Sequence, residues 1–230
     1  MPTQPILIAL DGPVSAGKSS LADAVAKELN ILHLDTGAMY RAVALAALQL
    51  GIDVRDEEAL EMLCLQGRAQ VEVRFIDQKQ STWLNGRSVD DAIRSQAVGS
   101  AASTVSRYRG VRRYLVRLQQ EMARQQSMII DGRDIGTVVL PQARAKVFIT
   151  ASPEMRAQRR FEQIKHKEPG VSFESVLKEL QSRDRQDEER LVDPLRKADD
   201  AVLLDTTSLG FEESVEAVLR IVEGAYAKQA

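Results

Sequence analysis

Residues 12–19 combine glycines, a lysine and a serine at a spacing that can bind phosphate. The stretch Gly12-Pro13-Val14-Ser15-Ala16-Gly17-Lys18-Ser19 fits the P-loop pattern G-x-x-x-x-G-K-[ST]. Glycines let the backbone wrap so that successive N–H groups point inward at an anion, and the N-terminus of a following helix also favours phosphate. Lys18 would add positive charge beside the β- and γ-phosphates, and the Ser19 hydroxyl can bind Mg²⁺. The spacing therefore predicts a nucleotide-binding loop.

The residues on either side of this loop are those that the motif requires. Ile6–Leu10 is a short apolar run, which predicts a buried strand. From Lys18 to Leu29 the apolar residues recur at helical spacing. Strand, glycine-rich turn and helix therefore follow one another in the order that phosphate binding needs.

Asp131 is a second candidate, because it ends the apolar run Met128–Ile130. Open α/β sheets bind their ligands at the carboxyl ends of the strands. A carboxylate there, beside a P-loop, is expected to bind Mg²⁺ through water or through another ligand of the ion. Asp131-Gly132 is also a common turn pair, but the independent strength of the P-loop favours the metal role.

The stretch LDTGAMYRA, residues 34–42, places Asp35 at the end of a second short strand. Thr36 is predicted to cap the helix that follows, with Tyr40 and Arg41 on its first turns. An aromatic ring close to a guanidinium suits a phosphate that carries a flat base. An exposed helix with an incidental arginine explains the same residues, so the pattern alone leaves both interpretations open.

Arginines are frequent in the second half of the chain and could stabilise a transferring phosphoryl group. They are Arg112, Arg113, Arg133, Arg156, Arg159, Arg160, Arg183, Arg185 and Arg190. A helical hairpin over residues 156–190 could bring several of them to a substrate and exclude water by closing. A solvated pair of helices joined by salt bridges is the alternative, because acidic residues nearly balance the basic ones there.

The bulk properties are those of one α/β domain. The 230 residues are 44% hydrophobic and 28% charged, with a formal net charge of −2. A mildly acidic chain has no general basic surface for nucleic acid, and no apolar run reaches the ~18 residues of a membrane span. Cys64 is the single cysteine, and the first residues do not resemble a signal peptide. We expect a cytoplasmic protein that binds neither nucleic acid nor membranes.

Alternation of strands and helices predicts a parallel sheet with helices on both of its faces. The five expected strands are 6–10, 31–34, 128–131, 146–150 and 201–205. The expected helices are 18–29, 37–50, 103–125, 153–167, 173–190 and 211–227. Between them, an alternating strand at 71–75 and the hairpin signal Asn85-Gly86 predict a small β-containing insertion.

Taken together, the stretches GPVSAGKSS, LDTGAMYRA, DGRDIGTVV and RAQRR, with the residues from Arg183 to Thr207, resemble the bacterial cytidylate kinases. The resemblance runs from about Ile6 to the C-terminus. It implies transfer of the γ-phosphoryl of ATP to CMP or dCMP, with Mg²⁺, by a cytoplasmic monomer. It also implies one domain with three regions: a core of residues 1–37, 101–155 and 191–230, an NMP-binding region of residues 38–100, and a lid of residues 156–190.

The resemblance implies roles for individual residues as well. Gly12 to Ser20 would hold the ATP phosphates, with Ser20 ending the loop, and Arg156 and Arg160 would belong to the ATP side of the lid. Arg41, Arg133 and Arg190 would hold the CMP phosphate beside Asp35, Thr36 and Tyr40. Ser103, Arg112 and Asp134 would recognise the cytosine edge, and Arg183 and Asp187 would hold the ribose. Lys18, Arg133, Arg190 and Asp131 would form the catalytic group, with Ser19 and Asp131 at the metal.

Other functions are tested against the same residues. A kinase for UMP or shikimate would use a similar loop, so substrate choice separates it. A GTP-dependent switch needs an Asn-Lys-x-Asp stretch, which neither Asn30 nor Asn85 begins. An RNA-binding segment at 107–117 would need more interleaved aromatics than Tyr108 and Tyr114.

Overall fold

The structure is a computed structural model that describes residues 5–166 and 170–227. The chain divides into two compact units. The first unit contains Met1–Ile6 and Ile31–Met128, and the second contains Leu7–Asn30 and Ile129–Ala230. The predicted P-loop therefore belongs to the second unit, and the predicted β-containing insertion belongs to the first.

A five-stranded parallel sheet carries the strands that the sequence predicts. They are β1 (Leu7–Asp11), β2 (Leu32–Asp35), β6 (Met128–Gly132), β7 (Ala145–Thr150) and β8 (Val202–Asp205), in the order β2-β6-β1-β7-β8. In the second unit, β7 pairs in parallel with β1, with Leu10 opposite Val147, and with β8, with Val147 opposite Val202. The predicted α/β class and the five strands are confirmed.

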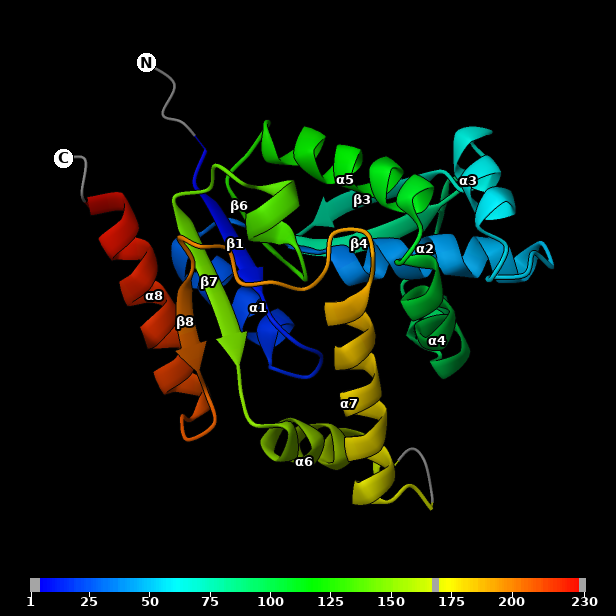
Figure 1. Ribbon diagram of the computed structural model, residues 1–230. Helices are drawn as coiled ribbons and strands as arrows, with labels where there is room; N and C mark the ends of the chain where they lie inside the picture. Colours follow the sequence, from blue (N-terminus) through cyan, green and yellow to red (C-terminus); the bar gives the residue numbers. More distant parts are fainter. Residues whose placement is uncertain (1–4, 167–169, 228–230) are drawn as a thin grey trace. The chain divides into compact units, whose positions relative to one another are not determined.

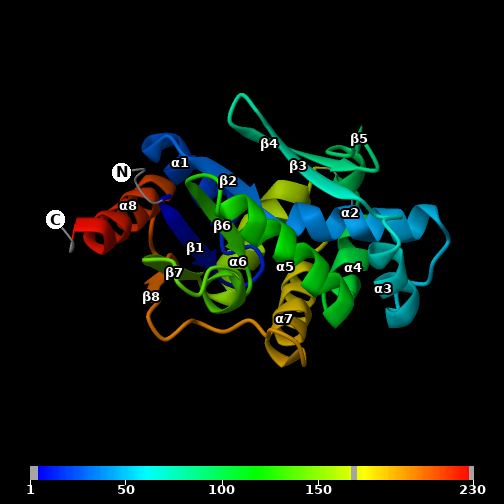
Figure 2. The same ribbon diagram turned by 90° about the horizontal axis from the view of Figure 1, so that it is seen from above.

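Helices of the second unit follow its strands, with the exception of the third helix, which follows another helix. They are α1 (Lys18–Leu29), α6 (Pro153–Ile164), α7 (Phe173–Glu189) and α8 (Phe211–Ala227). α1 and α8 contact each other, and α8 also contacts β7, while β7 leads directly into α6 (Figures 1 and 2). Ser152 caps α6 by accepting from the N–H of Met155, and Pro153 sits in its first turn. α1, α6 and α8 begin after the carboxyl ends of β1, β7 and β8, so their N-termini lie at that edge of the sheet.

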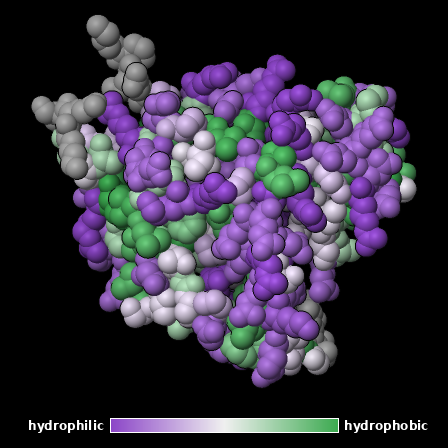
Figure 3. All heavy atoms as spheres, viewed as in Figure 1, coloured by the Kyte–Doolittle hydropathy of each residue, from purple (hydrophilic) through white to green (hydrophobic). Residues whose placement is uncertain are grey.

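The edge strand β8 is less well covered than the strands inside the sheet. Val202 and Leu203 are exposed, whereas Ile8, Leu10 and Val147 are buried. Hydrophobic surface is visible over β8 and α8 in Figure 3, on a face that is otherwise mostly hydrophilic. The core of the second unit therefore lies around β1 and β7, directly beneath the loop that follows β1.

The first unit holds helices around a small antiparallel sheet. Its elements are α2 (Thr36–Gln49), α3 (Glu57–Leu65), β3 (Val71–Ile76), β4 (Lys79–Leu84), β5 (Arg87–Ser88), α4 (Gln96–Val105) and α5 (Arg109–Ala123). Asn85 and Gly86 both have positive φ, 49° and 77°, and join β4 to β5. The predicted hairpin is therefore confirmed, and a second tight turn at Asp77-Gln78 joins β3 to β4.

The structure corrects three expectations about local structure. The helix predicted over 103–125 is two helices, because α4 ends at Val105 and α5 begins at Arg109. Thr36 is not the cap of α2: Asp35 takes that place, since its Oδ1 accepts from the N–H of Ala38 at 3.2 Å. Helix α3 was not predicted. The expected end of the helix at Lys167 lies outside the described residues.

Candidate active site

The P-loop follows β1 in the second unit, and its first glycine allows two strands to approach closely. Gly12 has a φ of 149°, and a Cβ atom at this position would overlap the carbonyl oxygen of Ile149 on β7. Gly17 has a φ of 87° and precedes α1, which begins at Lys18. The unpaired N–H groups at the start of α1 therefore belong to the same loop, as phosphate binding requires.

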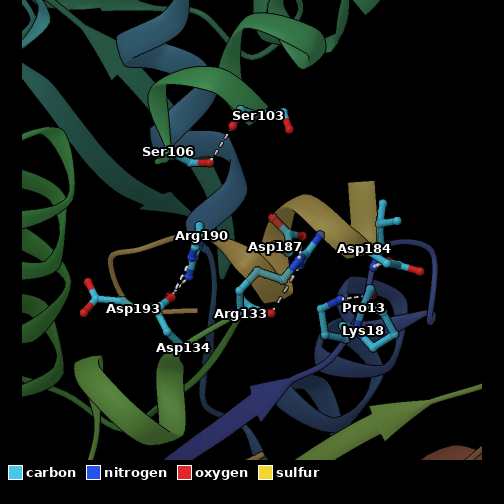
Figure 4. A network of polar contacts seen from close by, with 12 residues as sticks. Pro13, Lys18, Ser103, Ser106, Arg133, Asp134, Asp184, Asp187, Arg190 and Asp193 are labelled. Carbon is cyan, nitrogen blue, oxygen red and sulfur yellow. Dashed lines mark hydrogen bonds and ion pairs between the residues drawn. The ribbon is translucent and has the colours of Figure 1, made fainter. Parts of the chain in front are cut away.

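Lys18 is buried and held across its own loop. Its Nζ donates a hydrogen bond of 2.7 Å to the carbonyl oxygen of Pro13 (Figure 4). Burial, followed by the positive charge of Arg133, lowers the pKa of Lys18 to about 7, although Asp131, Asp187 and Asp11 oppose the change. The lysine is thus placed where an additional negative charge, such as a phosphate, would stabilise its protonated form.

Ser19 and Asp131 meet beside the loop. The Ser19 hydroxyl donates to Asp131 Oδ2 at 2.9 Å, and Asp131 is buried at the end of β6. A hydroxyl and a carboxylate are the oxygen ligands that Mg²⁺ accepts. No group of three or more His, Cys, Asp or Glu side chains that could hold a metal occurs among residues 5–166 and 170–227. The donor set thus fits Mg²⁺ bound jointly with phosphate oxygens rather than by the protein alone.

Two arginines of the second unit are anchored by carboxylates or carbonyls. Arg133 Nε donates to Asp187 Oδ2 at 2.7 Å, and Arg190 Nε donates to the carbonyl of Asp193 at 2.6 Å (Figure 4). Arg190 also lies 3.5 Å from Asp134 Oδ1. Burial would raise the pKa of Asp187, but the neighbouring charges, Arg133 first, lower it below the usual value. The predicted residues 133, 134, 187 and 190 are therefore joined in one charged network.

The remaining predicted residues of the second unit lie on α6 and α7. Arg183 is 3.9 Å from Glu179 and interacts electrostatically with both Arg133 and Asp187. Arg160 is exposed, whereas Arg156 is buried and hydrogen-bonded within the protein. Arg156 and Arg160, both predicted on the ATP side of a lid, thus differ sharply in their surroundings.

Asp11 is a buried carboxylate that the sequence analysis missed. Its Oδ1 accepts from the N–H of Ile135 at 2.8 Å and its Oδ2 from the N–H of Gly136 at 2.7 Å. These donors begin a π-helical turn, Ile135–Val139, directly after Arg133 and Asp134. Burial raises the pKa of Asp11 to about 6, although the two backbone hydrogen bonds lower it. Its position at the end of an apolar strand was the one signal that could have singled it out.

The first unit brings its predicted residues together on α2, α4 and α5. The Arg112 guanidinium lies 5.6 Å from the centre of the Tyr40 ring and donates to the carbonyl of Ser106 at 3.1 Å. Ser106 in turn donates to the carbonyl of Ser103 at 3.0 Å (Figure 4). Arg41 donates to the carbonyl of Ile93 at 3.2 Å.

Asp35 and Thr36 begin α2 in the same unit. The N–H of Asp35 donates to Gln80 Oε1 at 2.7 Å, and Thr36 is buried. The predicted acceptor residues are therefore divided between the two units, with Arg133, Asp134, Arg183, Asp187 and Arg190 in the second.

Comparison with known proteins identifies the family. Residues 8–224 match the protein family described as cytidylate kinase. A cytidylate kinase of Bacillus licheniformis is 43% identical over 218 residues, which cover 95% of this chain and 96% of that protein. A cytidylate kinase of Bacillus cereus is 44% identical over 223 residues, covering 97% and 98%.

A solved shikimate kinase from Bacteroides thetaiotaomicron aligns with 95% of this chain and 98% of its own, at 14% identity and a TM-score of 0.48. None of the helices in the described part of the chain is both long and apolar enough to cross a bilayer. From its match over nearly the whole sequence, the chain belongs to the cytidylate kinase family.

Proposed function

We propose that this member of the cytidylate kinase family transfers the γ-phosphoryl of ATP in line to the phosphate of CMP or dCMP, giving ADP and CDP or dCDP. The observation that carries the proposal is the presence in one unit of three contacts: Lys18 with the Pro13 carbonyl, Ser19 with Asp131, and Arg133 with Asp187. Phosphoryl transfer needs the donor phosphates and the acceptor phosphate to share one positively charged site. The loop lysine and an arginine of the DGRD stretch meet this need, because the charge of Arg133 is near enough to lower the pKa of Lys18.

On the donor side, the loop from Gly12 to Ser20 holds the ATP phosphates through its N–H groups and Lys18, and Arg160 closes over them. Ser19 and Asp131 would hold Mg²⁺ together with the phosphate oxygens. The ion, when bound, neutralises charge on the β- and γ-phosphates. Lys18 stabilises the negative charge that moves toward the leaving ADP, which is electrostatic rather than covalent catalysis.

On the acceptor side, Arg41, Arg133 and Arg190 hold the CMP phosphate, with Asp35, Thr36 and Tyr40 beside them. Ser103, Arg112 and Asp134 recognise the cytosine edge, because the exocyclic amine of cytosine is a donor that a carboxylate accepts. Arg183 and Asp187 hold the ribose. Asp187 and Asp134 also keep the guanidiniums of Arg133 and Arg190 in place before substrate binds, which reduces the ordering needed on binding. Arg133, Arg190, Lys18 and Asp131 thus act as the catalytic group.

No covalent intermediate is required. The acceptor phosphate is already ionised near neutral pH, since the second pKa of a phosphate monoester is about 6. Alignment of the two nucleotides and stabilisation of the transferring group therefore account for the reaction. The same resemblance supports one domain with core 1–37, 101–155 and 191–230, NMP-binding region 38–100 and lid 156–190, acting as a cytoplasmic monomer in pyrimidine metabolism.

The test is an ADP-release assay with ATP, Mg²⁺ and a panel of acceptors: CMP, dCMP, UMP, AMP, GMP and shikimate. We expect kcat/KM to be highest for CMP or dCMP. A higher value for UMP or shikimate would reassign the acceptor, and absence of ADP release with every nucleotide would refute the kinase mechanism.

A further inference from the structure

Val14, in the middle of the P-loop, has both polar groups of its backbone held by side chains of distant helices. Its N–H donates to Asp184 Oδ1 on α7 at 3.2 Å. Its carbonyl oxygen accepts from Arg156 on α6 at 3.0 Å. A loop that binds phosphate through its N–H groups depends on the orientation of each peptide. Here the side chains of Asp184 and Arg156 fix the orientation of the two peptide groups that flank Val14.

Arg156 and Asp184 also bind each other. The same NH1 group of Arg156 lies 2.6 Å from Asp184 Oδ2, and Arg156 Nε donates to the carbonyl of Ala151 at 3.0 Å. Arg156 is 4% exposed and Asp184 9%. A buried pair with this many directed hydrogen bonds holds one geometry, because any rearrangement would leave a buried charge without its partners.

The Val14 side chain belongs to the apolar core of the same two helices. It clusters with Ala157 and Ile164 of α6 and with Val176 and Leu180 of α7. Val14 is therefore at once a residue of the nucleotide-binding loop and a residue of the core of the helical pair. Backbone and side chain both connect the loop to these helices; in Figure 1, α6 lies below the end of β7 and α7 stands to its right.

We propose that Arg156 and Asp184 are positioning residues that hold the Val14 peptide so that the P-loop is shaped for the donor nucleotide. This clasp, Arg156 with Asp184, links the packing of α6 on α7 to the shape of the loop. This proposal rests on the assignment of residues 12–20 to ATP. In it, Arg156 acts on ATP binding by positioning Val14 and not by contact with the substrate. By linkage, a loop ordered by nucleotide also stabilises the α6–α7 pair.

The test removes both charges together, since a single substitution would leave the other charge buried alone. In the double variant Arg156→Met/Asp184→Leu, apolar side chains of similar length replace the pair, which keeps the packing and lets the chain fold. We expect the Kd and KM for ATP to rise about tenfold, with the KM for CMP at saturating ATP changed by less than about twofold.

The matched control is Glu162→Gln, which breaks the exposed ion pair between Glu162 and Lys165 on the same helix and should leave ATP binding unchanged. Unfolding melts and circular dichroism identify variants that fold. A folded double variant that binds ATP as wild type does, or one that loses ATP and CMP affinity equally, would overturn the clasp. Lys18→Ala, measured in parallel, separates the two proposals: if it too leaves the use of ATP unaffected, the P-loop assignment itself fails.

Discussion

The Nζ of Lys18 donates a hydrogen bond of 2.7 Å to the carbonyl oxygen of Pro13, so the lysine side chain crosses from the end of the P-loop to its beginning. This hydrogen bond keeps the buried amino group of Lys18 in place, while the positive charge of Arg133 lowers the pKa of the lysine. Such an arrangement is unfavourable until an anion arrives, because a phosphate satisfies both cations. Loop and arginine together therefore form a site prepared for negative charge.

Removal of this charge should abolish most of the turnover. We expect Lys18→Ala to fold and to lower kcat by about 10²–10³, the range for loss of one group that stabilises charge in a transition state. The measurement is steady-state kinetics with ATP and CMP. Lys27→Ala, an exposed lysine on the same helix α1, is the control, and an unchanged kcat in Lys18→Ala would refute the catalytic role.

Nucleotide binding should be accompanied by proton uptake. With a pKa of about 7 in the ligand-free protein, Lys18 is largely neutral at pH 8. Phosphate groups beside it raise this pKa, so the complex takes up a proton at pH 8 and little at pH 6, where the lysine is already charged. Calorimetry in buffers of different ionisation enthalpy measures the uptake. It should disappear in Lys18→Arg, whose side chain is always charged, and uptake that persists in this variant would come from another group.

The raised pKa of Asp11 should make the folded protein less stable toward unfolding as pH rises. Burial raises its pKa in the folded protein to about 6, well above the ordinary value of an aspartate. The folded state therefore binds the proton more tightly, and the stabilising contribution of this proton is lost as pH rises through 6. Between pH 5 and pH 7.5, wild type should lose about 1 kcal/mol relative to Asp11→Asn. Urea unfolding of both proteins at the two pH values measures this, and a parallel dependence of the two would show that Asp11 titrates normally.

Asp131 should control the dependence on Mg²⁺. Because its Oδ2 lies 2.9 Å from the Ser19 hydroxyl, Asp131→Asn should raise the Mg²⁺ concentration for half-maximal rate by about 10–100-fold, as loss of a group that orients a metal ligand does. Activity is titrated with Mg²⁺ at fixed ATP. Asp205→Asn, an exposed carboxylate that ends β8 of the same sheet, is the control, and equal Mg²⁺ curves for wild type and Asp131→Asn would remove Asp131 from the metal site.

The elements that the sequence predicted correctly are those specified by local pattern. β1, β6 and β7 are apolar runs that end at polar residues, and the P-loop is a single stretch whose glycines and lysine are read directly. The break between α4 and α5 was missed because no glycine or proline marks it: Ser106–Tyr108 are compatible with a helix by composition. Residue patterns in the sequence predict elements with strong local conformational preferences, but they do not predict a helix break that has no such preference.

What the sequence could not provide is contact between distant residues. Asp11 binds backbone groups 124 and 125 residues away, and Asp184 binds Val14 from 170 residues away. None of these acceptors or donors carries a motif, because any residue offers a backbone N–H. Arg156 was expected on the ATP side of the lid, and only its surroundings, with Val14 and Asp184 as hydrogen-bond partners, suggest a role through the loop.

Asp134 should determine preference for cytosine more than affinity for ATP. It is buried and lies 3.5 Å from Arg190 NH2, and its carboxylate can accept from the exocyclic amine of cytosine, whereas uracil presents an oxygen at that position. We expect Asp134→Ala to raise the KM for CMP at least about tenfold and to reduce the preference for CMP over UMP, because a site that loses its hydrogen-bonding group loses discrimination. The measurement is kcat/KM for CMP and UMP, with the KM for ATP determined in the same preparation.

Asp134→Asn is the companion variant, since an amide oxygen still accepts from the amine while the charge beside Arg190 is lost. If Asp134 acts on the base, the Asn variant should retain more of the preference for CMP than the Ala variant. If it acts by holding Arg190, both variants should lose turnover with CMP and UMP alike, because the arginine is proposed to bind the phosphate that the two nucleotides share. Equal losses for CMP, UMP and ATP would contradict both roles, since neither recognition of cytosine nor support of the acceptor phosphate would then account for the change.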